Sequence, residues 1–220
     1  MLLFKLLVFA IVSISSLIFS NINLDNINSF DFINFIDGLI LKYGNNDIVG
    51  KLVINSLDVD TPIVQGKDNL YYLKYDEYKN ENSKGAIFID YRNNIDIDRK
   101  LLIYGHNSRE SDTIFKKLES YLSFDFFSNS DNREVEINTR NKKMIYEVSS
   151  VFVVDKDFSH MDLSFSLDEW NSHIDWINNS SIYDIELNYS DEIIIMQTCY
   201  YEPDNSFLLV ILKKIDEIYY

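Results

Sequence analysis

With 220 residues, 46% of them hydrophobic and 15% aromatic, the chain is long enough for one domain with a sizeable core and an additional segment. Its 20 basic and 35 acidic residues give a formal charge of −15, which argues against nucleic-acid binding because phosphate groups require a basic surface. The few prolines and glycines form no flexible linker, and no repeat with a period of roughly 20–50 residues is present.

The N-terminal segment differs from the rest of the chain. Residues 1–20 are apolar or small except for Lys5, and a membrane-spanning helix requires roughly 20 such residues. Lys5 precedes this run and acidic residues follow it from Asp25 onward, so the positive-inside rule predicts a cytoplasmic N-terminus and an extracellular domain. No small-x-small cleavage site follows the run, which favours an uncleaved anchor over a cleaved signal peptide. We therefore predict a single-pass anchor in the cell membrane at 1–21, a helical lead-in at 22–44 and a domain at 45–220.

Apolar spacing predicts a first helix over 25–43, with Asp25 as its N-cap. Short apolar runs predict strands at 49–55, 63–65, 86–90, 101–105, 134–138, 143–155, 192–198 and 207–214. Further helices are expected at 68–76 (Leu70 and Leu73 inward), at 112–122 (Ile114, Phe115, Leu118, Tyr121 and Leu122 on one stripe) and from Ser166 (Leu167, Trp170, Ile174 and Ile177 on the apolar face). Ser166 and Glu169 have the spacing of a capping box. Many short strands with few helices favour a mainly β domain with a closed or nearly closed barrel, while the pattern alone leaves a sandwich open.

Two of the expected strands end in groups that can carry chemistry. Cys199 is the only cysteine in the chain and follows the strand at 192–198, and His106 follows Gly105 in the same way. Nucleophilic cysteine chemistry needs a thiolate and a neighbouring imidazole that raises the thiolate population or carries the proton of the leaving group. A single cysteine outside the cytoplasm cannot form an intramolecular disulfide, so this thiol is either a packing residue or a reactive group.

Several motifs in a fixed order resemble the sortases, membrane-anchored cysteine transpeptidases of Gram-positive bacteria, and specifically class B. In chain order the motifs are Asp47-Ile48-Val49-Gly50, residues 62–69, Tyr71-Tyr72-Leu73, residues 87–93, Ile103-Tyr104-Gly105-His106-Asn107, residues 151–154, the helix at 166–178 and Thr198-Cys199-Tyr200-Tyr201-Glu202. The similarity runs from about residue 45 to residue 214. The resemblance implies an eight-stranded sortase β-barrel with a few helices behind an N-terminal transmembrane helix, with no cofactor and no required metal.

The resemblance also implies a reaction. Cys199 would attack the backbone carbonyl after a threonine in the C-terminal sorting signal of an exported protein, and an amine of a peptidoglycan precursor would release the thioacyl intermediate. His106 would protonate the departing amine and deprotonate the incoming one. The expected partners are surface proteins that bear sorting signals, the cell-wall amine and the membrane. Family correspondence assigns five residues to the groove for the sorting peptide, namely Asn69, Leu73, Tyr104, Gln197 and Thr198.

The chain departs from the class B pattern at an arginine that the family carries about eight residues after the cysteine, where this sequence has Phe207. Phe207 is predicted to bind substrate as well, by filling the space of the arginine with an apolar contact that makes the groove less polar. In the family that arginine is taken to position the substrate and stabilise the oxyanion, and loss of one such donor typically costs roughly 3–4 kcal/mol. Lys213 shares the strand face of Phe207 but lies roughly 20 Å along the strand. Arg92, Arg99 and Arg109 fall on loops that the sequence does not place.

Three functions therefore stay open. They are a transpeptidase, a sortase-like protein that binds sorting signals without turnover, and a cysteine peptidase that hydrolyses its thioester. The remaining polar groups near the motifs receive structural roles. His160 and His173 are predicted to lie on the solvated surface without metal-binding spacing, and Asp90 and Glu202 are assigned to ion pairs or capping.

Overall fold

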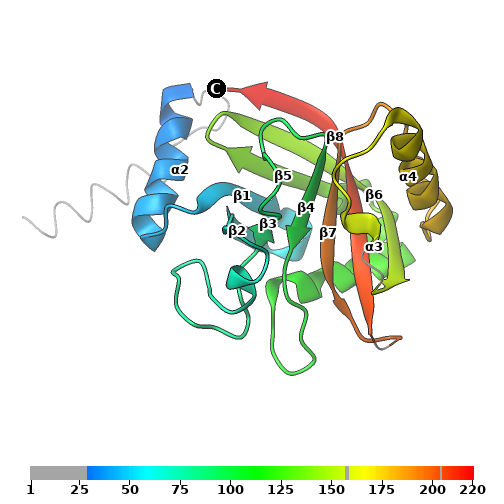
Figure 1. Cartoon of the computed structure of the whole chain (residues 1–220), viewed down its shortest axis with the longest axis horizontal. Coiled ribbons are helices and arrows are strands. Elements are labelled where there is room, and N and C mark those ends of the chain that lie inside the picture. The colour runs from blue at the N-terminus through cyan, green and yellow to red at the C-terminus, as the bar shows by residue number, and fades with distance from the viewer. Residues whose placement is uncertain (1–28, 157–158, 204) are drawn as a thin grey trace, which may run out of the picture.

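The computed structural model of the protein describes residues 29–156, 159–203 and 205–220, with side chains from residue 35 onward (Figure 1). The anchor predicted at 1–21 and the N-cap predicted at Asp25 lie outside these residues. None of the helices in the described part combines the length and the apolar content that crossing a membrane requires.

The described residues form a closed barrel with the strand order β1-β2-β3-β4-β7-β8-β6-β5. Its strands are β1 (Ile48–Ile54), β2 (Val59–Val64), β3 (Phe88–Ile89), β4 (Lys100–Tyr104), β5 (Glu134–Thr139), β6 (Lys142–Asp155), β7 (Ile193–Tyr200) and β8 (Ser206–Tyr219). The pairs β2–β3 and β4–β7 are parallel, and the other neighbours are antiparallel. The mainly β fold class and the closed eight-stranded barrel are thus confirmed for this part of the chain.

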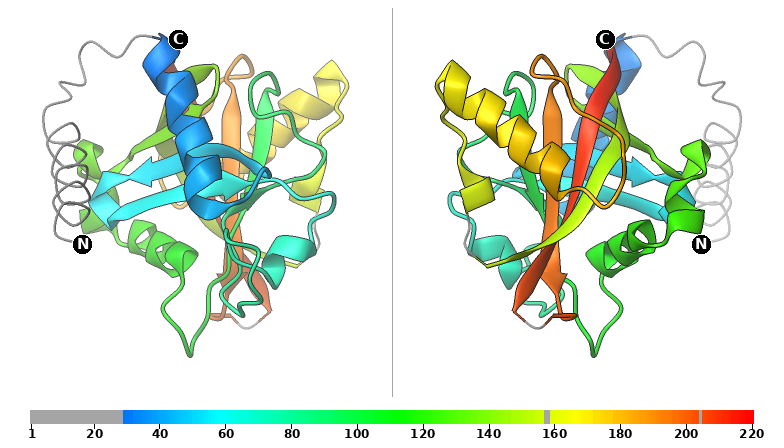
Figure 2. Two further views of the ribbon diagram at one scale, coloured as in Figure 1. Left: turned by 90° about the vertical axis from the view of Figure 1, so that its left-hand side faces the viewer. Right: turned by 90° about the vertical axis from the view of Figure 1, so that its right-hand side faces the viewer.

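Helical elements surround the barrel. They are the α-helices α2 (Ser29–Tyr43), α3 (Phe124–Phe127) and α4 (Leu167–Ser180), and the 3-10 helices η2 (Asn55–Leu57), η3 (Tyr71–Leu73), η4 (Ile114–Leu122), η5 (Ser130–Asn132) and η6 (Ser159–Met161). The helices α2 and α4 lie on opposite sides of the barrel (Figures 1 and 2).

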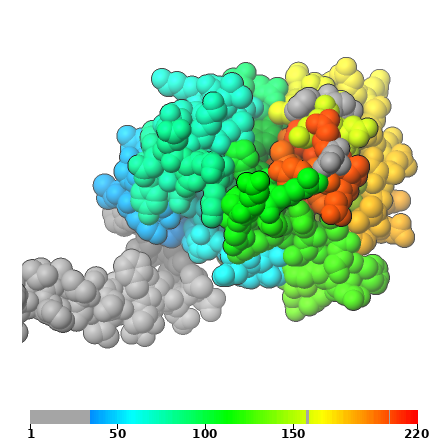
Figure 3. Space-filling model, turned by 90° about the horizontal axis from the view of Figure 1, so that it is seen from below, coloured from blue at the N-terminus to red at the C-terminus, as the bar shows by residue number. Residues whose placement is uncertain are grey.

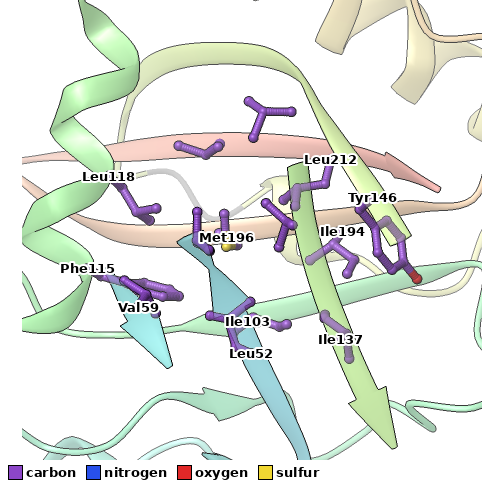
Figure 4. Packing of buried hydrophobic residues seen from close by; sticks show 14 of the residues in the cluster. Leu52, Val59, Ile103, Phe115, Leu118, Ile137, Tyr146, Ile194, Met196 and Leu212 are labelled. Carbon is purple, nitrogen blue, oxygen red and sulfur yellow. The ribbon is translucent and has the colours of Figure 1, made fainter. Parts of the chain in front are cut away.

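Apolar side chains pack on both sides of the barrel wall. Ile103, Ile194 and Met196 belong to the interior cluster, which Figure 4 shows from close by. Their sequence neighbours Leu102 and Ile195 belong to an outer cluster that also contains the inward residues of α4. Because successive side chains of a strand point to opposite faces, β4 and β7 bury both faces and read as continuous apolar runs. Polar chemistry is therefore confined to the ends of these strands and the loops beyond them.

The helix predicted at 112–122 is a 3-10 helix, η4, and it packs against the interior cluster. Phe115, Leu118 and Tyr121 are buried in that cluster. A 3-10 helix has three residues per turn, so side chains at i, i+3 and i+6 form one row. Ile114 lies outside this row and is 37% exposed, so the prediction that it points inward is wrong.

The helix α4 begins with the predicted capping box, which is confirmed. The Ser166 hydroxyl accepts a hydrogen bond from the Glu169 backbone N–H, and the Glu169 carboxylate accepts one from the Ser166 backbone. Trp170, Ile174 and Ile177 are buried as predicted. Leu167 is 72% exposed instead of inward, because the first helical residue stands beyond the packed stripe.

His173 lies on the inner side of α4 and is only 9% exposed, so the prediction of a solvated surface position is wrong. Its ring stacks against Phe165 and Trp176, at centroid distances of 5.0 and 5.4 Å. Burial lowers the pKa of His173 to about 3, with the nearby Lys100 acting in the same direction. This imidazole is therefore neutral and serves as an aromatic packing residue.

The segment predicted as a short helix at 68–76 contains only the three-residue turn η3. Leu70 is 69% exposed rather than inward, and Leu73 is half-buried. The buried residue is Tyr72, whose hydroxyl donates to Asp47 at 2.8 Å and accepts from Asn45 at 3.0 Å. This paired hydroxyl ties the segment before β3 to the residues that precede β1.

Gly105 lies where two side chains close over the backbone. A Cβ atom at this position would lie 2.5 Å from Ile87 Cδ1 and 2.7 Å from the Phe115 ring. We expect G105A to lower the free energy of unfolding by about 1–3 kcal/mol, because an aromatic ring body must move. Gly38 in α2 is the matched control, since a Cβ there meets nothing within 4 Å. G38A should leave stability unchanged or raise it, and equal urea midpoints for both variants would contradict the argument.

Candidate active site

The parallel pairing of β4 with β7 brings the ends of these two strands together. Tyr104 is the register partner of Gln197. One residue further, the Gly105 N–H donates to the Gln197 carbonyl at 3.3 Å, and the Thr198 hydroxyl donates to the Gly105 carbonyl at 2.8 Å. The next residues are His106 on one strand and Cys199 on the other. Since neighbouring strands lie roughly 4.8 Å apart, this register places residues 106 and 199 beside each other at one end of the barrel.

Loops from both strands meet at this end. The Tyr201 hydroxyl donates to the Asn107 carbonyl at 2.9 Å, and the Arg109 guanidinium donates to the Tyr201 carbonyl at 2.9 Å. Figure 3 views the molecule from this end, with the loop after β4 in green beside the β7–β8 turn in orange to red. Cys199 is half-buried, and no hydrogen bond joins it to His106 in the described residues.

The ring of His106 is held by the segment before β3. Its Nε2 lies 2.8 Å from the carbonyl oxygen of Leu73. A carbonyl only accepts, so Nε2 carries the hydrogen and Nδ1 is the basic atom of the neutral ring. Gly85, with φ +60°, lets the chain approach this ring, because a Cβ there would lie 3.0 Å from His106 Cδ2 and 2.5 Å from the Tyr72 carbonyl. The imidazole therefore has a fixed orientation before any substrate binds.

Residues 156 and 159–166, between β6 and α4 and hereafter the β6–α4 segment, fold back over the outer face of β4 and β7. The Lys100 ammonium donates to the carbonyls of His160 and Asp162, both at 2.8 Å. His160 Nε2 also lies 2.6 Å from the Gln197 side-chain oxygen. His160 is only 1% exposed, so its predicted surface position is wrong. The His160 ring is buried against Phe207, at a centroid distance of 5.9 Å, and the contact with Gln197 satisfies one of its nitrogens.

A cleft of about 790 Å³ opens at the far end of the β6–α4 segment. It is lined by Arg92, Lys100, Phe165 and Trp170 among others. Lys100 begins β4 and His106 follows its end, so the cleft lies roughly 20 Å from the imidazole at about 3.3 Å per residue. Burial lowers the pKa of Lys100 to about 7. The cleft therefore lies beside the contacts that Lys100 makes with the β6–α4 segment and is remote from His106.

Asn69 and Tyr104 meet at a buried carboxylate, Asp90. The Tyr104 hydroxyl and the Asn69 amide donate to it at 2.9 and 2.8 Å. Arg92 adds two donors, at 2.8 and 2.9 Å, and thereby forms the ion pair expected of Asp90. Burial raises the pKa of this carboxyl, but the hydrogen bonds from Arg92, Asn69 and Tyr104 outweigh it and lower the pKa to about 2.

The other residues assigned to the groove lie on different faces. Leu73 and Gln197 lie on the outer side of the barrel with Cys199, where Leu73 packs against the outer cluster. Thr198 is 2% exposed and alternates with its neighbours, so it faces the other side of β7. Its hydroxyl holds Gly105, which makes it a positioning residue in this structure rather than a lining residue.

Phe207, where the resemblance to class B predicts an arginine, is the cross-strand partner of Cys199. It is 6% exposed. The four cationic residues that the sequence offers in place of an arginine bind other groups. Their partners are Asp191 for Lys213, Asp90 for Arg92, the carbonyls of Tyr189 and Asp191 for Arg99, and the Tyr201 carbonyl for Arg109. Among the described residues no group of three or more metal-ligating side chains is placed to hold a metal ion.

Lys156 is a candidate functional residue that no sequence motif marked. Its ammonium lies 5.2 Å from the centroid of the Phe207 ring. Lys156 directly follows the predicted strand at 143–155, but the pairing register of β6 with β8 was needed to place it beside residue 207.

The pKa of Asp90 gives a stability prediction with a definite sign. Because the folded-state pKa lies below the ordinary value near 3.9, the stabilisation is complete above about pH 5 and is lost as the pH falls through about 2. We expect D90N to lower the free energy of unfolding by about 2–3 kcal/mol at pH 7, from a shift of about two pKa units. Urea unfolding at pH 7 and below pH 3 should show the difference shrinking in acid. D184N, at an exposed carboxylate, is the control and should stay within about 0.5 kcal/mol at both pH values.

Comparison with known proteins agrees with this geometry. The sortase domain family model matches residues 52–212. Sortase B of Listeria monocytogenes is 34% identical over 165 residues, which are 73% of this chain and 65% of that protein, so the match spans slightly less than two thirds of the relative. The structure of Clostridium perfringens sortase B has a TM-score of 0.74 at 30% identity, covering 82% of this chain and 99% of that one. A Staphylococcus aureus sortase B–substrate complex has a TM-score of 0.73 at 26% identity, covering 82% and 84%. The chain belongs to the sortase family, and the relatives it resembles are class B members.

Proposed function

We propose that the protein is a cysteine transpeptidase that cleaves a C-terminal sorting signal of exported proteins and transfers them to a cell-wall amine. The observation that carries the proposal is the position of Cys199 and His106 at the ends of two neighbouring parallel strands. The outer face beside the thiol carries Leu73, Gln197 and Tyr104, on the side of the barrel that the β6–α4 segment covers. The likeness to a sortase B that has been solved with a substrate supports the same assignment.

In the proposed reaction the Cys199 thiol gives its proton to His106. The thiolate then attacks the scissile carbonyl carbon, and the carbonyl electron pair moves to oxygen. Collapse of this oxyanion breaks the C–N bond, and the departing amine takes a proton from His106. A peptidoglycan amine then attacks the thioester, loses its proton to His106 and releases the thiolate. The Leu73 carbonyl keeps the ring in one orientation through both proton transfers, since it holds Nε2–H throughout.

The test is acylation of the full-length protein in detergent with a panel of sorting-signal peptides, followed by intact mass. Because Cys199 is the only thiol, any thioester reports this residue. We expect C199A to form no adduct and H106Q to acylate about 10²–10⁴-fold more slowly. Release of the peptide that depends on an added amine would distinguish transfer from hydrolysis. Peptide binding without an adduct over many hours would instead favour a protein that binds sorting signals without turnover.

We further propose that residues 1–21 anchor the protein in the cell membrane, with the domain at 45–220 outside the cell. The apolar run with its single early lysine supports this orientation. The full chain should stay in the membrane pellet after alkaline extraction, and protease added to intact cells should remove the domain. A protein recovered in the soluble fraction would overturn the anchor but leave the chemistry untouched.

A further inference from the structure

Three strands place one row of side chains beside the thiol. Cys199 of β7 pairs with Phe207 of β8, and Phe207 pairs on its other side with Val154 of β6. Directly opposed residues of antiparallel strands lie roughly 5 Å apart and point to the same face. The ring of Phe207 therefore forms the floor next to the sulfur, at the place where a cation on β8 would otherwise stand.

A cation does lie over this floor, but it comes from β6. Lys156 follows the last residue of β6, and its ammonium lies 5.2 Å from the centroid of the Phe207 ring. The side chain is half-buried, and no carboxylate of the described residues lies within ion-pair distance of it. In this respect Lys156 differs from Arg92 and Lys213, whose charges carboxylates neutralise.

We propose that Lys156 supplies the positive charge that the family places at position 207, and that the Phe207 ring is its seat in the resting enzyme. This role rests on the proposed acyl transfer. When the thiolate attacks and the carbonyl electron pair moves to oxygen, the ammonium donates a hydrogen bond to that oxyanion and keeps its own protons. The charge is delivered by a flexible stem from the neighbouring strand rather than by a side chain on β8.

The interaction between Lys156 and the Phe207 ring is weak enough for the ammonium to move to the oxyanion. A cation over an aromatic ring at a partly exposed site is held only weakly, so the ammonium leaves the ring readily when a full negative charge develops nearby. A preorganised donor to the oxyanion contributes several times more. The Phe207 ring thus keeps the Lys156 ammonium close to the sulfur but does not prevent it from donating a hydrogen bond to the oxyanion.

The first test measures charge at the thiol without any substrate. Iodoacetate carries a negative charge and iodoacetamide does not, so the ratio of their alkylation rates at Cys199 reports a nearby cation. We expect K156Q to lower this ratio about threefold in low salt, and the difference to fade in 1 M NaCl, because salt screens the interaction. K117Q is the control, since the Lys117 ammonium bonds to the Asp58 carbonyl on another part of the barrel. An unchanged ratio in K156Q would overturn the proposal.

The second test measures acylation. K156Q should lower kcat for thioester formation about 10²–10³-fold with a smaller change in KM, and K156R should recover most of the loss. F207R should restore activity in the K156Q background, because it returns a cation to β8. A wild-type protein that acylates while K156Q acylates equally fast overturns this role and leaves the proposed function standing. A wild-type protein that forms no adduct with any peptide overturns both.

Discussion

The parallel pairing of β4 with β7 is the constraint on which the site depends. Five residue pairs, from Lys100 with Ile193 to Tyr104 with Gln197, set one register along both strands. Side chains of both strands are buried on two faces, so a slip by one residue would turn every apolar side chain to the wrong cluster. The same register decides which residues emerge together at the strand ends. Packing energy along the whole strand pair thus fixes the relative position of a thiol and an imidazole that share no hydrogen bond.

On the outer face, polar contacts hold the β6–α4 segment in place beside the apolar outer cluster. Lys100, buried at the start of β4, holds the carbonyls of two residues of the β6–α4 segment, while Gln197 holds the ring of His160. Losing one of these hydrogen bonds would destabilise the fold, because no water can replace the lost partner of a buried polar group. The Asp90 carboxylate plays a similar part at the other edge, where it gathers Tyr104, Asn69 and Arg92. These polar contacts therefore fix the β6–α4 segment and the loop after β3 against the barrel.

Local patterns predicted the elements well, and the failures have one physical origin. Apolar runs placed the strands, and the Ser166–Glu169 spacing predicted a capping box, because both are properties of neighbouring residues. Strand β8 runs on to Tyr219, beyond the predicted end, because it pairs with β6 as far as Lys142. His160 and His173 are polar in sequence, and only the folding of the β6–α4 segment onto β7 and α4 buries them. Such burial depends on tertiary contacts that no local pattern encodes.

Phe207, where the class B pattern predicts an arginine, illustrates the same limit for the site. In the sequence alone, position 207 carries no charge, which argues against catalysis by this protein. In the folded sheet, β6 runs beside β8, and Lys156, which directly follows β6, places its ammonium over the Phe207 ring. An oxyanion responds to the position of a charge and not to the strand that supplies it. The unit to consider is thus the row Val154–Phe207–Cys199 together with Lys156 above it, and in the proposed role Lys156 supplies the charge that Phe207 lacks.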